Sequence, residues 1–477
     1  MATVVILVIL RLSVGCHFFY EGVWKIKHAD EFSSEPFLTQ AKGPFAPMFY
    51  AMVPDLDGKK RLKIEKIARA DDGLVARWQK YQSDAETRFR TQLDKAGKLK
   101  DEAERKKLRD FTQASRRLLW DTEDKLDSLI ARQEKALIEY FASDDKEKPA
   151  EQAKDWMAEF ATTENAFLDA LGKLIEESTG AESPSFNKGV PGGTDAAALS
   201  KVVSVRNGIK GGQALDTWSQ VKTDIAKKYR LSDDQRYELE KVFRRYKDSL
   251  KQYLAENLAD IAAYHGSRTR FEQRRAEGNN GADHQKKRTW DEQQKLRREV
   301  GQWLGEIDQL QDDFGSAAWA LLSDAQKRRG DIPMPSTRGD FVDFMVTYGL
   351  TAIGFCLLLG LFTRPAALGG AAFLTFVLMT QPPWPTIYPP APGVVGHALL
   401  VDKNFIELVG LLLIASCAAG RWAGLDYFVE HYVLQGLRKC GLKCCCCCTD
   451  TDQANTDTDT DTSEQSEQNP ETEKEGA

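Results

Sequence analysis

The apolar residues of this chain gather in two regions, and this placement constrains its fold more than any other feature. They concentrate in residues 4–24 and 341–420, whereas the segment between them is rich in charges of both signs. A helix needs about 20 consecutive apolar residues to cross the hydrocarbon core of a bilayer. The mean hydropathy of -0.45 averages over both kinds of segment and hides the contrast. The sequence therefore predicts an integral membrane protein with a large soluble insert.

Four hydrophobic segments predict four membrane-spanning helices, the first in residues 1–28 and the other three in residues 340–426. The first segment lacks the basic start and the small-residue cleavage site of a signal peptide, and Arg11 interrupts it, so we expect it to remain attached. The third and fourth are short, but their close spacing and sharp polar stops support the set as a whole. The four segments are residues 4–24, 341–362, 366–380 and 405–420.

Residues 29–339 predict an extramembrane helical insert. Its two halves, residues 58–180 and 213–330, are rich in helix-forming residues, and a Gly/Pro/Ser-rich linker at residues 181–212 divides them. Apolar residues recur at helical spacing within each half. The expected fold class is therefore all-α. It combines a four-helix transmembrane bundle with a soluble insert of bundled or coiled-coil-like helices and a disordered acidic tail.

Two short motifs occur twice in the insert. Leu-Ser-Asp-x-Gln places Ser232 and Gln235 in the spacing of a helix-starting capping box, and a second copy contains Ser323. Trp-Asp followed by Lys-Leu begins at Trp120 and again at Trp290. The second repeat leaves open whether the insert arose by duplication.

Basic residues near the span ends predict the orientation. The positive-inside rule places the basic side of the bundle in the cytoplasm. We therefore expect a multi-pass protein of the cytoplasmic (inner) membrane, with both termini in the cytoplasm and residues 29–339 outside. Lys25 and Lys27 argue mildly against this orientation, and the lack of cysteine between Lys25 and Gly339 argues for it. The basic residues that share one side are Arg364, Arg421, Arg438, Lys439 and Lys443.

The end of the chain predicts a tail of two parts. Residues 427–448 combine a juxtamembrane amphipathic helix with a run of adjacent cysteines at positions 444–448. S-acylation, metal or thiol chemistry, and no defined role all stay open for these cysteines. Residues 449–477 are rich in Thr, Asp, Glu and Gln and almost free of apolar residues, so we expect them to be disordered.

The insert contains no catalytic signature. It has no CxxC, H-E-x-x-H or P-loop motif, and residues 189–194 lack the lysine of a phosphate loop and are typical of a flexible linker. His265 and His284 are isolated, so no metal site is predicted. The net charge of -6 and the absence of a basic block give no reason to expect nucleic acid as a partner. We expect the chain itself to bind no cofactor.

Three stretches of the hydrophobic segments carry a family resemblance. They are Leu10-Arg11-Leu12 with Phe18, Phe19, Gly22 and Lys25, then residues 358–364, then Asn404-Phe405 and Glu407-Leu408 with residues 420–426. In this order they resemble the DoxX family of small four-helix membrane proteins. The resemblance covers residues 1–28 and 340–428. Family members usually join the first two helices by a short loop, and many have an acidic residue early in the second helix. Here the loop is the whole insert, and the matching Gly349-Leu350-Thr351 has no acid.

The resemblance implies a membrane subunit associated with redox chemistry. The family is named after a subunit linked to thiosulfate oxidation with electron transfer to quinone. It implies a quinone as the candidate substrate. The expected partners are the lipid bilayer and an electron-donating protein. Whether the chain is part of an enzyme stays open. If it is, it is a subunit of a quinone-linked oxidoreductase, and an oligomer is compatible with the sequence.

Five ionisable residues near the spans are candidates for a polar intramembrane pocket. Each costs roughly 2.5–3.5 kcal/mol inside a bilayer and is therefore expected to face the bundle interior and to be paired. In one interpretation Arg11 binds a quinone head group or a small anion, and neighbouring groups carry protons. In the other, Arg11 forms a structural salt bridge with Glu407, and Lys25 extends to the interface. The five are Arg11, His17, Glu21, Lys25 and Glu407.

A second class of function stays open beside the redox subunit. The chain would then be a non-enzymatic membrane anchor that presents the helical extracytoplasmic domain to a partner or to the cell envelope.

Overall fold

The chain is predominantly helical in the computed structural model, which describes residues 2–29, 31–144, 147–277, 282–334, 338–382, 384, 401–417, 419–429 and 431. Within these ranges two strands interrupt the helices. In chain order the elements are α1 (Ala2–Lys27), α2 (Glu35–Thr39), α3 (Ala46–Tyr50), β1 (Ile64–Ala70), α4 (Asp72–Lys95), the 3-10 helix η1 (Lys98–Lys100), α5 (Glu102–Ala142), α6 (Glu147–Thr179), α7 (Ala196–Leu199), β2 (Val203–Ile209), α8 (Gly212–Tyr229), α9 (Asp233–Glu256), α10 (Leu258–Ala276), α11 (Asp283–Ala320), α12 (Asp324–Lys327), α13 (Arg338–Leu359), α14 (Thr363–Thr380), α15 (Lys403–Ser416) and α16 (Asp426–Phe428).

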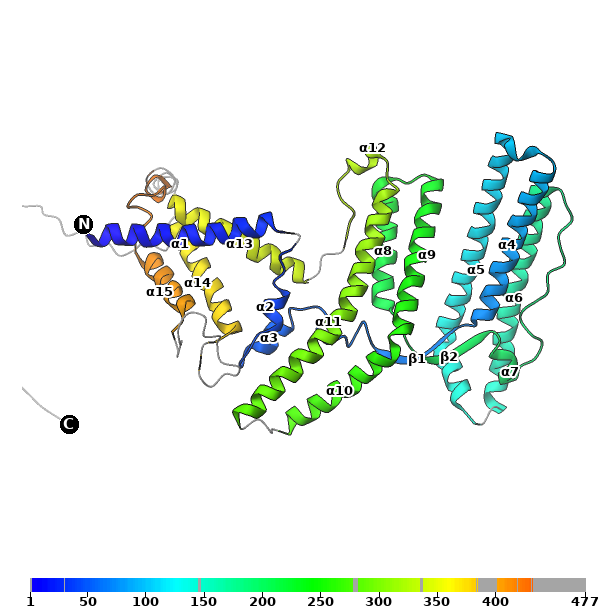
Figure 1. Ribbon diagram of the computed structural model, residues 1–477, viewed down its shortest axis with the longest axis horizontal. Coiled ribbons are helices and arrows are strands. Elements are labelled where there is room, and N and C mark those ends of the chain that lie inside the picture. Colours follow the sequence, from blue (N-terminus) through cyan, green and yellow to red (C-terminus); the bar gives the residue numbers. More distant parts are fainter. Residues whose placement is uncertain are drawn as a thin grey trace, which may run out of the picture.

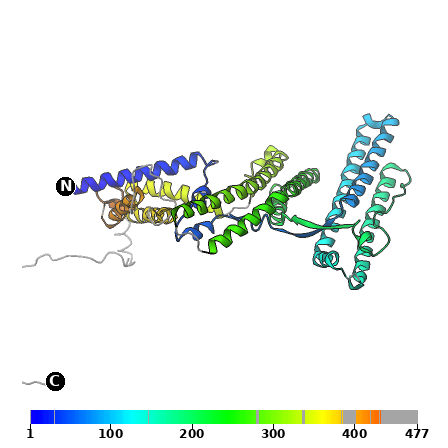
Figure 2. The same cartoon turned by 60° about the horizontal axis from the view of Figure 1, so that its bottom comes forward.

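The molecule is elongated, and three groups of helices follow one another along its long axis (Figure 1). The apolar helices α1, α13, α14 and α15 form a bundle at one end. The middle group, formed by α8 to α12, is called the proximal unit, and the far group, formed by α4 to α7, is called the distal unit. The order is the same in the turned view (Figure 2). The two units together form an arm that extends from the bundle.

The four apolar helices pack around one core. α1 and α13 lie antiparallel, because Gly15 is next to Leu357 while Gly22 is next to Thr351. The contact is close, since a Cβ atom at Gly354 would lie 2.2 Å from the backbone nitrogen of Phe19. Small residues allow helix backbones to approach in this way. The buried core consists of Val14, Phe18, Leu350, Leu357, Ala367, Ala371, Leu374, Leu411, Ile414 and Ala419.

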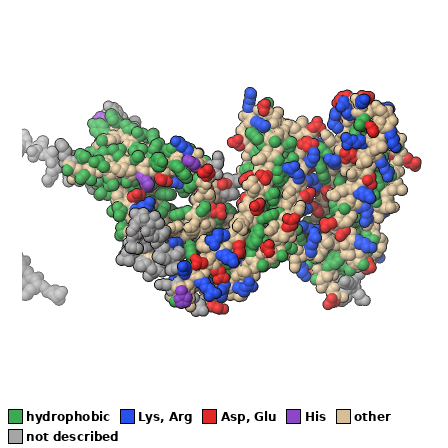
Figure 3. Space-filling view, viewed as in Figure 1, with side chains coloured by type: hydrophobic (Ala, Val, Ile, Leu, Met, Phe, Trp, Pro, Cys, Tyr) green, Lys and Arg blue, Asp and Glu red, His purple; other side chains and the backbone are tan. Residues whose placement is uncertain are grey.

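Two helices, α1 and α13, are long and apolar enough to cross a membrane by length and composition. Only 28% of the apolar window of α1 and 22% of that of α13 are buried, unlike the core helix of a soluble protein. The surface of the bundle is mostly hydrophobic, whereas that of the arm mixes both charges (Figure 3). α15 ends at Ser416, shorter than the expected segment. The mostly helical fold is as predicted, and two of the four predicted spans meet this criterion.

A short segment after α1 folds over the end of the bundle from which the insert leaves. This cap segment, residues 32–56, contains α2 and α3. The backbone N–H of Ser34 donates to Oδ1 of Asp343 at 2.7 Å, and that of Lys42 donates to the carbonyl of Thr380 at 2.8 Å. Its small apolar core also contacts α13 and α14. That core consists of Leu38, Ala41, Ala46, Phe49 and Val53, with Val342 and Met379 packed against it.

The two units of the arm are joined by a two-stranded antiparallel ribbon. β1 pairs with β2 in a register that runs from Ile64 opposite Ile209 to Ala70 opposite Val203. The all-α prediction omits this ribbon, because the pairing joins segments far apart in sequence. β2 and α7 also lie within the predicted linker at residues 181–212. In the stretch at residues 189–194, which is typical of a flexible linker, Gly189 belongs to the distal unit through hydrogen bonds to Glu164.

Both units follow the same plan. Each begins with one strand of the ribbon, and the next helix contains a fully buried tryptophan. Trp78 Nε1 donates to Oε1 of Glu164 at 3.0 Å, and Trp218 Nε1 donates to Oε1 of Gln311 at 3.1 Å. A phenylalanine three residues after each acceptor lies against the indole, with ring centroids 5.6 Å and 6.2 Å apart. The two units therefore share one arrangement around a buried tryptophan, in a register different from that of the Trp-Asp repeat.

The two Leu-Ser-Asp-x-Gln motifs meet in the proximal unit. Gln235 and Gln326 accept the backbone N–H of Ser232 and of Ser323, as the capping-box spacing predicts. Their amides also donate to each other at 2.9 and 3.0 Å. Each further donates, at 3.1 Å, to a backbone carbonyl just before the other motif. The repeated motif therefore joins the start of α9 to the end of α11.

Candidate functional site

Arg11 lies in a buried junction at the end of the bundle opposite the cap segment. Its side chain is 1% exposed. Nη1 donates to the carbonyl of Ala419 and Nη2 to that of Ala423, both at 2.9 Å. The planar guanidinium suits this forked contact. Among the described residues Nε has no hydrogen-bond partner. A Cβ atom at Gly360 would lie 2.6 Å from Cα of Gly424, and one at Gly424 would lie 2.5 Å from the carbonyl oxygen of Gly420, so a side chain at either position would clash with backbone.

Two tight turns bring the backbone to Arg11. α13 ends with Gly360 and Phe362 in the left-handed region, at φ values of 64° and 50°. The carboxylate of Asp426 then accepts the backbone N–H of Thr363 at 3.0 Å, and the N–H of Asp426 donates to the carbonyl of Gly360 at 2.8 Å. A carboxylate at the first turn of α14 also interacts favourably with the helix dipole. We call Arg11, residues 360–363 and residues 419–426 the Arg11 junction.

The other predicted pocket residues lie elsewhere. Glu407 does not pair with Arg11, because the terminal nitrogens of Arg11 bind the carbonyls of Ala419 and Ala423 instead. The Oε1 of Glu407 lies 4.0 Å from Nε2 of His17, between α15 and α1. Lys25 Nζ lies 3.0 Å from Oε2 of Glu21, the i,i+4 pair that the spacing indicates. The five candidates therefore fall into three separate groups. The two terminal nitrogens of Arg11 bind backbone carbonyls, and the other four residues form two partly exposed pairs.

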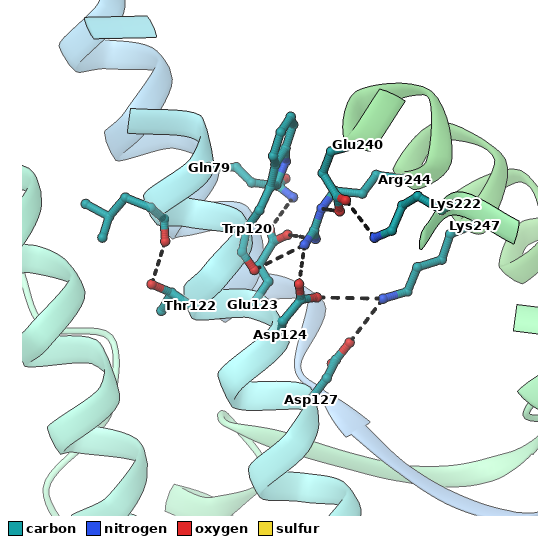
Figure 4. A network of polar contacts seen from close by, with 11 residues as sticks. Gln79, Trp120, Thr122, Glu123, Asp124, Asp127, Lys222, Glu240, Arg244 and Lys247 are labelled. Atoms are coloured by element: carbon teal, nitrogen blue, oxygen red, sulfur yellow. Dashed lines mark hydrogen bonds and ion pairs between the residues drawn. The ribbon is translucent and has the colours of Figure 1, made fainter. Parts of the chain in front are cut away.

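A second polar site, the inter-unit cluster, lies between α5 of the distal unit and α9 of the proximal unit (Figure 4). Arg244 is at its centre and donates to carboxylates of both units. Its Nη1 is 3.3 Å from Glu123, its Nε is 2.9 Å from Glu240, and its Nη2 donates to Asp124. Lys222 pairs with Glu240 at 2.7 Å. The guanidinium of Arg244 thus links the two units.

Aromatic rings complete the inter-unit cluster. The indole of Trp120 stacks on the ring of Tyr237 with centroids 5.4 Å apart, and the guanidinium of Arg244 lies 5.3 Å from the indole centroid. Arg117 lies over the other aromatic ring at 5.7 Å. Beside them is a pocket of about 350 Å³ lined by these two rings and by equal numbers of basic and acidic side chains. This balance suits a contact between units better than a site for a strongly charged ligand.

Burial perturbs two ionisable groups near this cluster. It raises the pKa of the Glu123 carboxyl, and this effect is opposed by a hydrogen bond from Gln79 and by Arg244. It lowers the pKa of Lys251, and the neighbouring Lys247 lowers it further. Both shifts follow from desolvation in a tight helix contact. They need no catalytic role to explain them.

Little in the sequence indicates the inter-unit cluster, although Trp120 is half of a repeated Trp-Asp pair. The cluster joins residues more than a hundred positions apart, so no local spacing predicts it. Three predicted features lie wholly or mostly outside the described residues: the cysteine run at 444–448, the tail at 449–477 and most of the juxtamembrane helix at 427–448. Within the described ranges, no three His, Cys, Asp or Glu side chains gather as a metal site. The comparisons with known proteins found no matching family model, no matching curated protein and no matching solved structure.

Proposed function

We propose that this protein is a non-enzymatic membrane anchor that presents a helical arm to a partner or to the cell envelope. The observation that carries the proposal is the geometry of the insert. Its first and last residues leave the same end of an apolar bundle, and between them it forms an elongated arm of two units (Figure 1). The arm has mixed surface charge and balanced ionic contacts. A surface of this kind suits contacts with another protein better than it suits catalysis.

The Arg11 junction supports the structural role of the bundle. Both terminal nitrogens of Arg11 are already bound to backbone carbonyls, so the guanidinium is occupied within the chain. A ligand at this place would have to displace those carbonyls, which would then lose their partners at a cost of about 1–3 kcal/mol each. The junction holds α1 against the ends of α13 and α15. It thus fastens the anchor on which the arm depends.

We further propose that the four apolar helices form a DoxX-like transmembrane bundle. Part of each of the three stretches that resemble the family contributes to the Arg11 junction: Arg11 itself, the turn at residues 360–363 and the segment at residues 420–426. This convergence gives the resemblance a physical basis, since each stretch would be needed to close the same end of the bundle. α14 and α15 would cross the bilayer as short helices within the bundle.

Topology tests the anchor. In a variant without the nine native cysteines, single cysteines would replace Lys98 in the distal unit and Ala2 at the start of α1. We expect a membrane-impermeant maleimide to label Lys98→Cys on intact cells, or on spheroplasts where an outer membrane is present. Ala2→Cys should react only after permeabilisation. Labelling of both positions from one side, or release of the protein by alkaline carbonate, would refute the anchor.

A quinone-linked redox subunit is the second candidate, and the His17–Glu407 pair favours it. His17 is 50% exposed and Glu407 is 30% exposed, so both can exchange protons with a ligand at the surface of the bundle. Reduction of a quinone to a quinol takes up two electrons, here from a partner protein, and two protons. The pair could supply those protons one after the other.

Quinone-dependent electron flux separates the two candidates. In membranes that contain the full chain and its electron donor, His17→Phe and Glu407→Gln should each lower the flux at least about tenfold if the pair delivers protons. Tyr20→Phe, an exposed position on the same helix, is the matched control. Unchanged flux in both variants at normal protein level would remove the redox role and leave the anchor.

A further inference from the structure

The tip of the α10–α11 hairpin has a strong positive charge in an acidic chain. Residues 268–298 contain ten Lys and Arg against five Asp and Glu, although the whole chain has a net charge of -6. The remainder of the chain is therefore markedly acidic. Several of the basic side chains at the tip are exposed, among them Arg270, Arg275, Lys287, Arg288 and Arg298. A local excess of charge of this kind attracts ligands of the opposite sign.

A pocket of about 580 Å³ lies between the two helices near this tip. Five Lys and Arg side chains and His284 line it against two acidic side chains, Asp291 and Glu292. Glu292 is already paired with Arg274, which lies on the opposite wall of the pocket. The pocket therefore has a net positive lining that suits a phosphate group. The basic lining residues are Arg274, His284, Lys287, Arg288, Lys295 and Arg298.

The cap segment fixes where this tip lies relative to the bundle. Arg297 of α11 stacks on the ring of Tyr50 at 3.9 Å and donates to the carbonyl of Thr39. About two turns earlier in α11, the ring centroid of Trp290 lies 5.8 Å from the Nζ of Lys42. The cap segment is itself bonded to the end of α14. The start of α11 is therefore held beside the bundle.

The tip lies level with the ends of the apolar helices. α10 and α11 run back toward the bundle, and their tips reach the same position along the long axis as the ends of α13 and α14 (Figures 1 and 2). If the bundle spans a bilayer, this position is the bilayer surface. Exposed apolar side chains of the cap segment lie in the same region, namely Phe37, Phe45 and Met48. Apolar and basic residues combined in this way are typical of surfaces that contact lipid.

We propose that the α10–α11 tip binds the phosphate groups of anionic phospholipids at the surface of the membrane in which the bundle is anchored. This inference rests on the proposed membrane anchor. The pocket would take one headgroup phosphate, and the accessible basic residues around it would contact neighbouring headgroups. With the bundle and the tip both attached, the arm is held at a defined angle to the membrane.

Lipid proximity of the tip tests the proposal in the full chain. A cysteine-free variant with Ala282→Cys, labelled with a fluorophore, would be reconstituted in phosphatidylcholine vesicles with and without about one third phosphatidylglycerol. A quencher attached to the lipid headgroup reports contact. We expect strong quenching only with phosphatidylglycerol, and its loss as salt is raised from about 0.05 to 0.5 M, because salt screens contacts to headgroups.

Charge reversal provides the matched comparison. The triple variant Lys287→Glu, Arg288→Glu and Arg298→Glu should weaken the tip contact by at least tenfold, since each basic residue near an anionic surface contributes about fivefold. The control reverses Lys95, Lys98 and Lys100 at the far end of the distal unit, which changes the net charge equally. Equal quenching in the triple variant and the control would overturn the proposal.

Two further outcomes distinguish a lipid contact at the tip from a site for soluble phosphate and from failure of the anchor. Competition by millimolar glycerol phosphate, with no dependence on phosphatidylglycerol, would assign the pocket to a soluble phosphate and overturn the lipid assignment. Extraction by alkaline carbonate would show that the anchor itself has failed. Tip quenching that is absent in a chain still resistant to carbonate would overturn the lipid contact alone.

Discussion

Glu164 illustrates how one buried carboxylate organises the distal unit. It is 1% exposed and accepts hydrogen bonds from the indole of Trp78 and from the backbone N–H groups of Gly189 and Val190. The donors come from α4 and from the loop after α6. A carboxyl group this deeply buried is tolerated only when its oxygens are hydrogen-bonded. The equivalent acceptor in the proximal unit, Gln311, is a neutral amide that accepts from the indole of Trp218.

Glu164→Ala should therefore destabilise the distal unit by roughly 2–4 kcal/mol, because an indole and two backbone donors lose their acceptor. Hydrogen exchange of the full chain should accelerate first in the peptides that cover residues 186–203. Glu159→Ala, which removes an exposed carboxylate on the same helix that accepts a hydrogen bond from Gln133 at 2.9 Å, is the control. Exchange that stays as slow as in the control would contradict the assigned role.

Among the helices, the contact between α1 and α13 joins α1 to the apolar bundle. Gly15 and Gly22 of α1 face the backbone of α13, and Gly354 of α13 faces the backbone of α1. Because these positions have no side chain, the two apolar helices can approach closely. In lipid the hydrophobic effect adds little to helix association, so close packing supplies the attraction. The arrangement also explains why α1, although separated from α13 by the whole insert, forms the first helix of the same bundle.

Gly354→Leu should disrupt this contact, since even a Cβ atom there would lie 2.2 Å from a backbone nitrogen of α1. We expect a loss of at least about 3 kcal/mol, because backbone cannot move aside as a flexible side chain does. Gly349→Leu on the same helix has open space around its Cβ and should be tolerated. Thermal unfolding in detergent, followed by size-exclusion chromatography, measures both. Equal stability of the two variants would show that the helices are not held by this contact.

The whole molecule depends on how its two units are joined. The ribbon of β1 and β2 supplies two covalent connections, and a ribbon of two strands can bend. The inter-unit cluster supplies the second contact, centred on Arg244. With both in place the arm keeps one shape, and with the ribbon alone the distal unit would be free to swing.

Arg244→Ala should therefore widen the distribution of distances between the units, at a cost of roughly 1–3 kcal/mol to their contact. Spin labels at positions 98 and 282 of the cysteine-free full chain, read by pulsed electron resonance, report this distance. Lys241→Ala on the same helix, which pairs only with Glu238 among the ion pairs of the described residues, is the control. A distribution as narrow as that of the control would mean that the ribbon alone sets the shape of the arm.

The sequence by itself determined the local features of this protein. Apolar runs and helical periodicity marked the helices of the bundle and the arm, because burial and backbone hydrogen bonding act within a few residues. The capping boxes at Ser232 and Ser323 and the Glu21–Lys25 pair follow from spacing of three or four residues, and the structure places them as predicted.

Only the tertiary structure decided the rest, because the deciding contacts join distant positions. Arg11 reaches carbonyls 408 and 412 residues away, so no spacing could favour them over Glu407. β1 and β2 become a ribbon only through each other, since the hydrogen bonds of a strand are made with a neighbouring strand and not within the strand itself. The arrangement shared by Trp78 and Trp218 depends on a hydrogen bond from each indole to an acceptor on a later helix, Glu164 or Gln311. Each of these side chains and strands could have paired with many partners, and the packing of distant segments determines which partner it has.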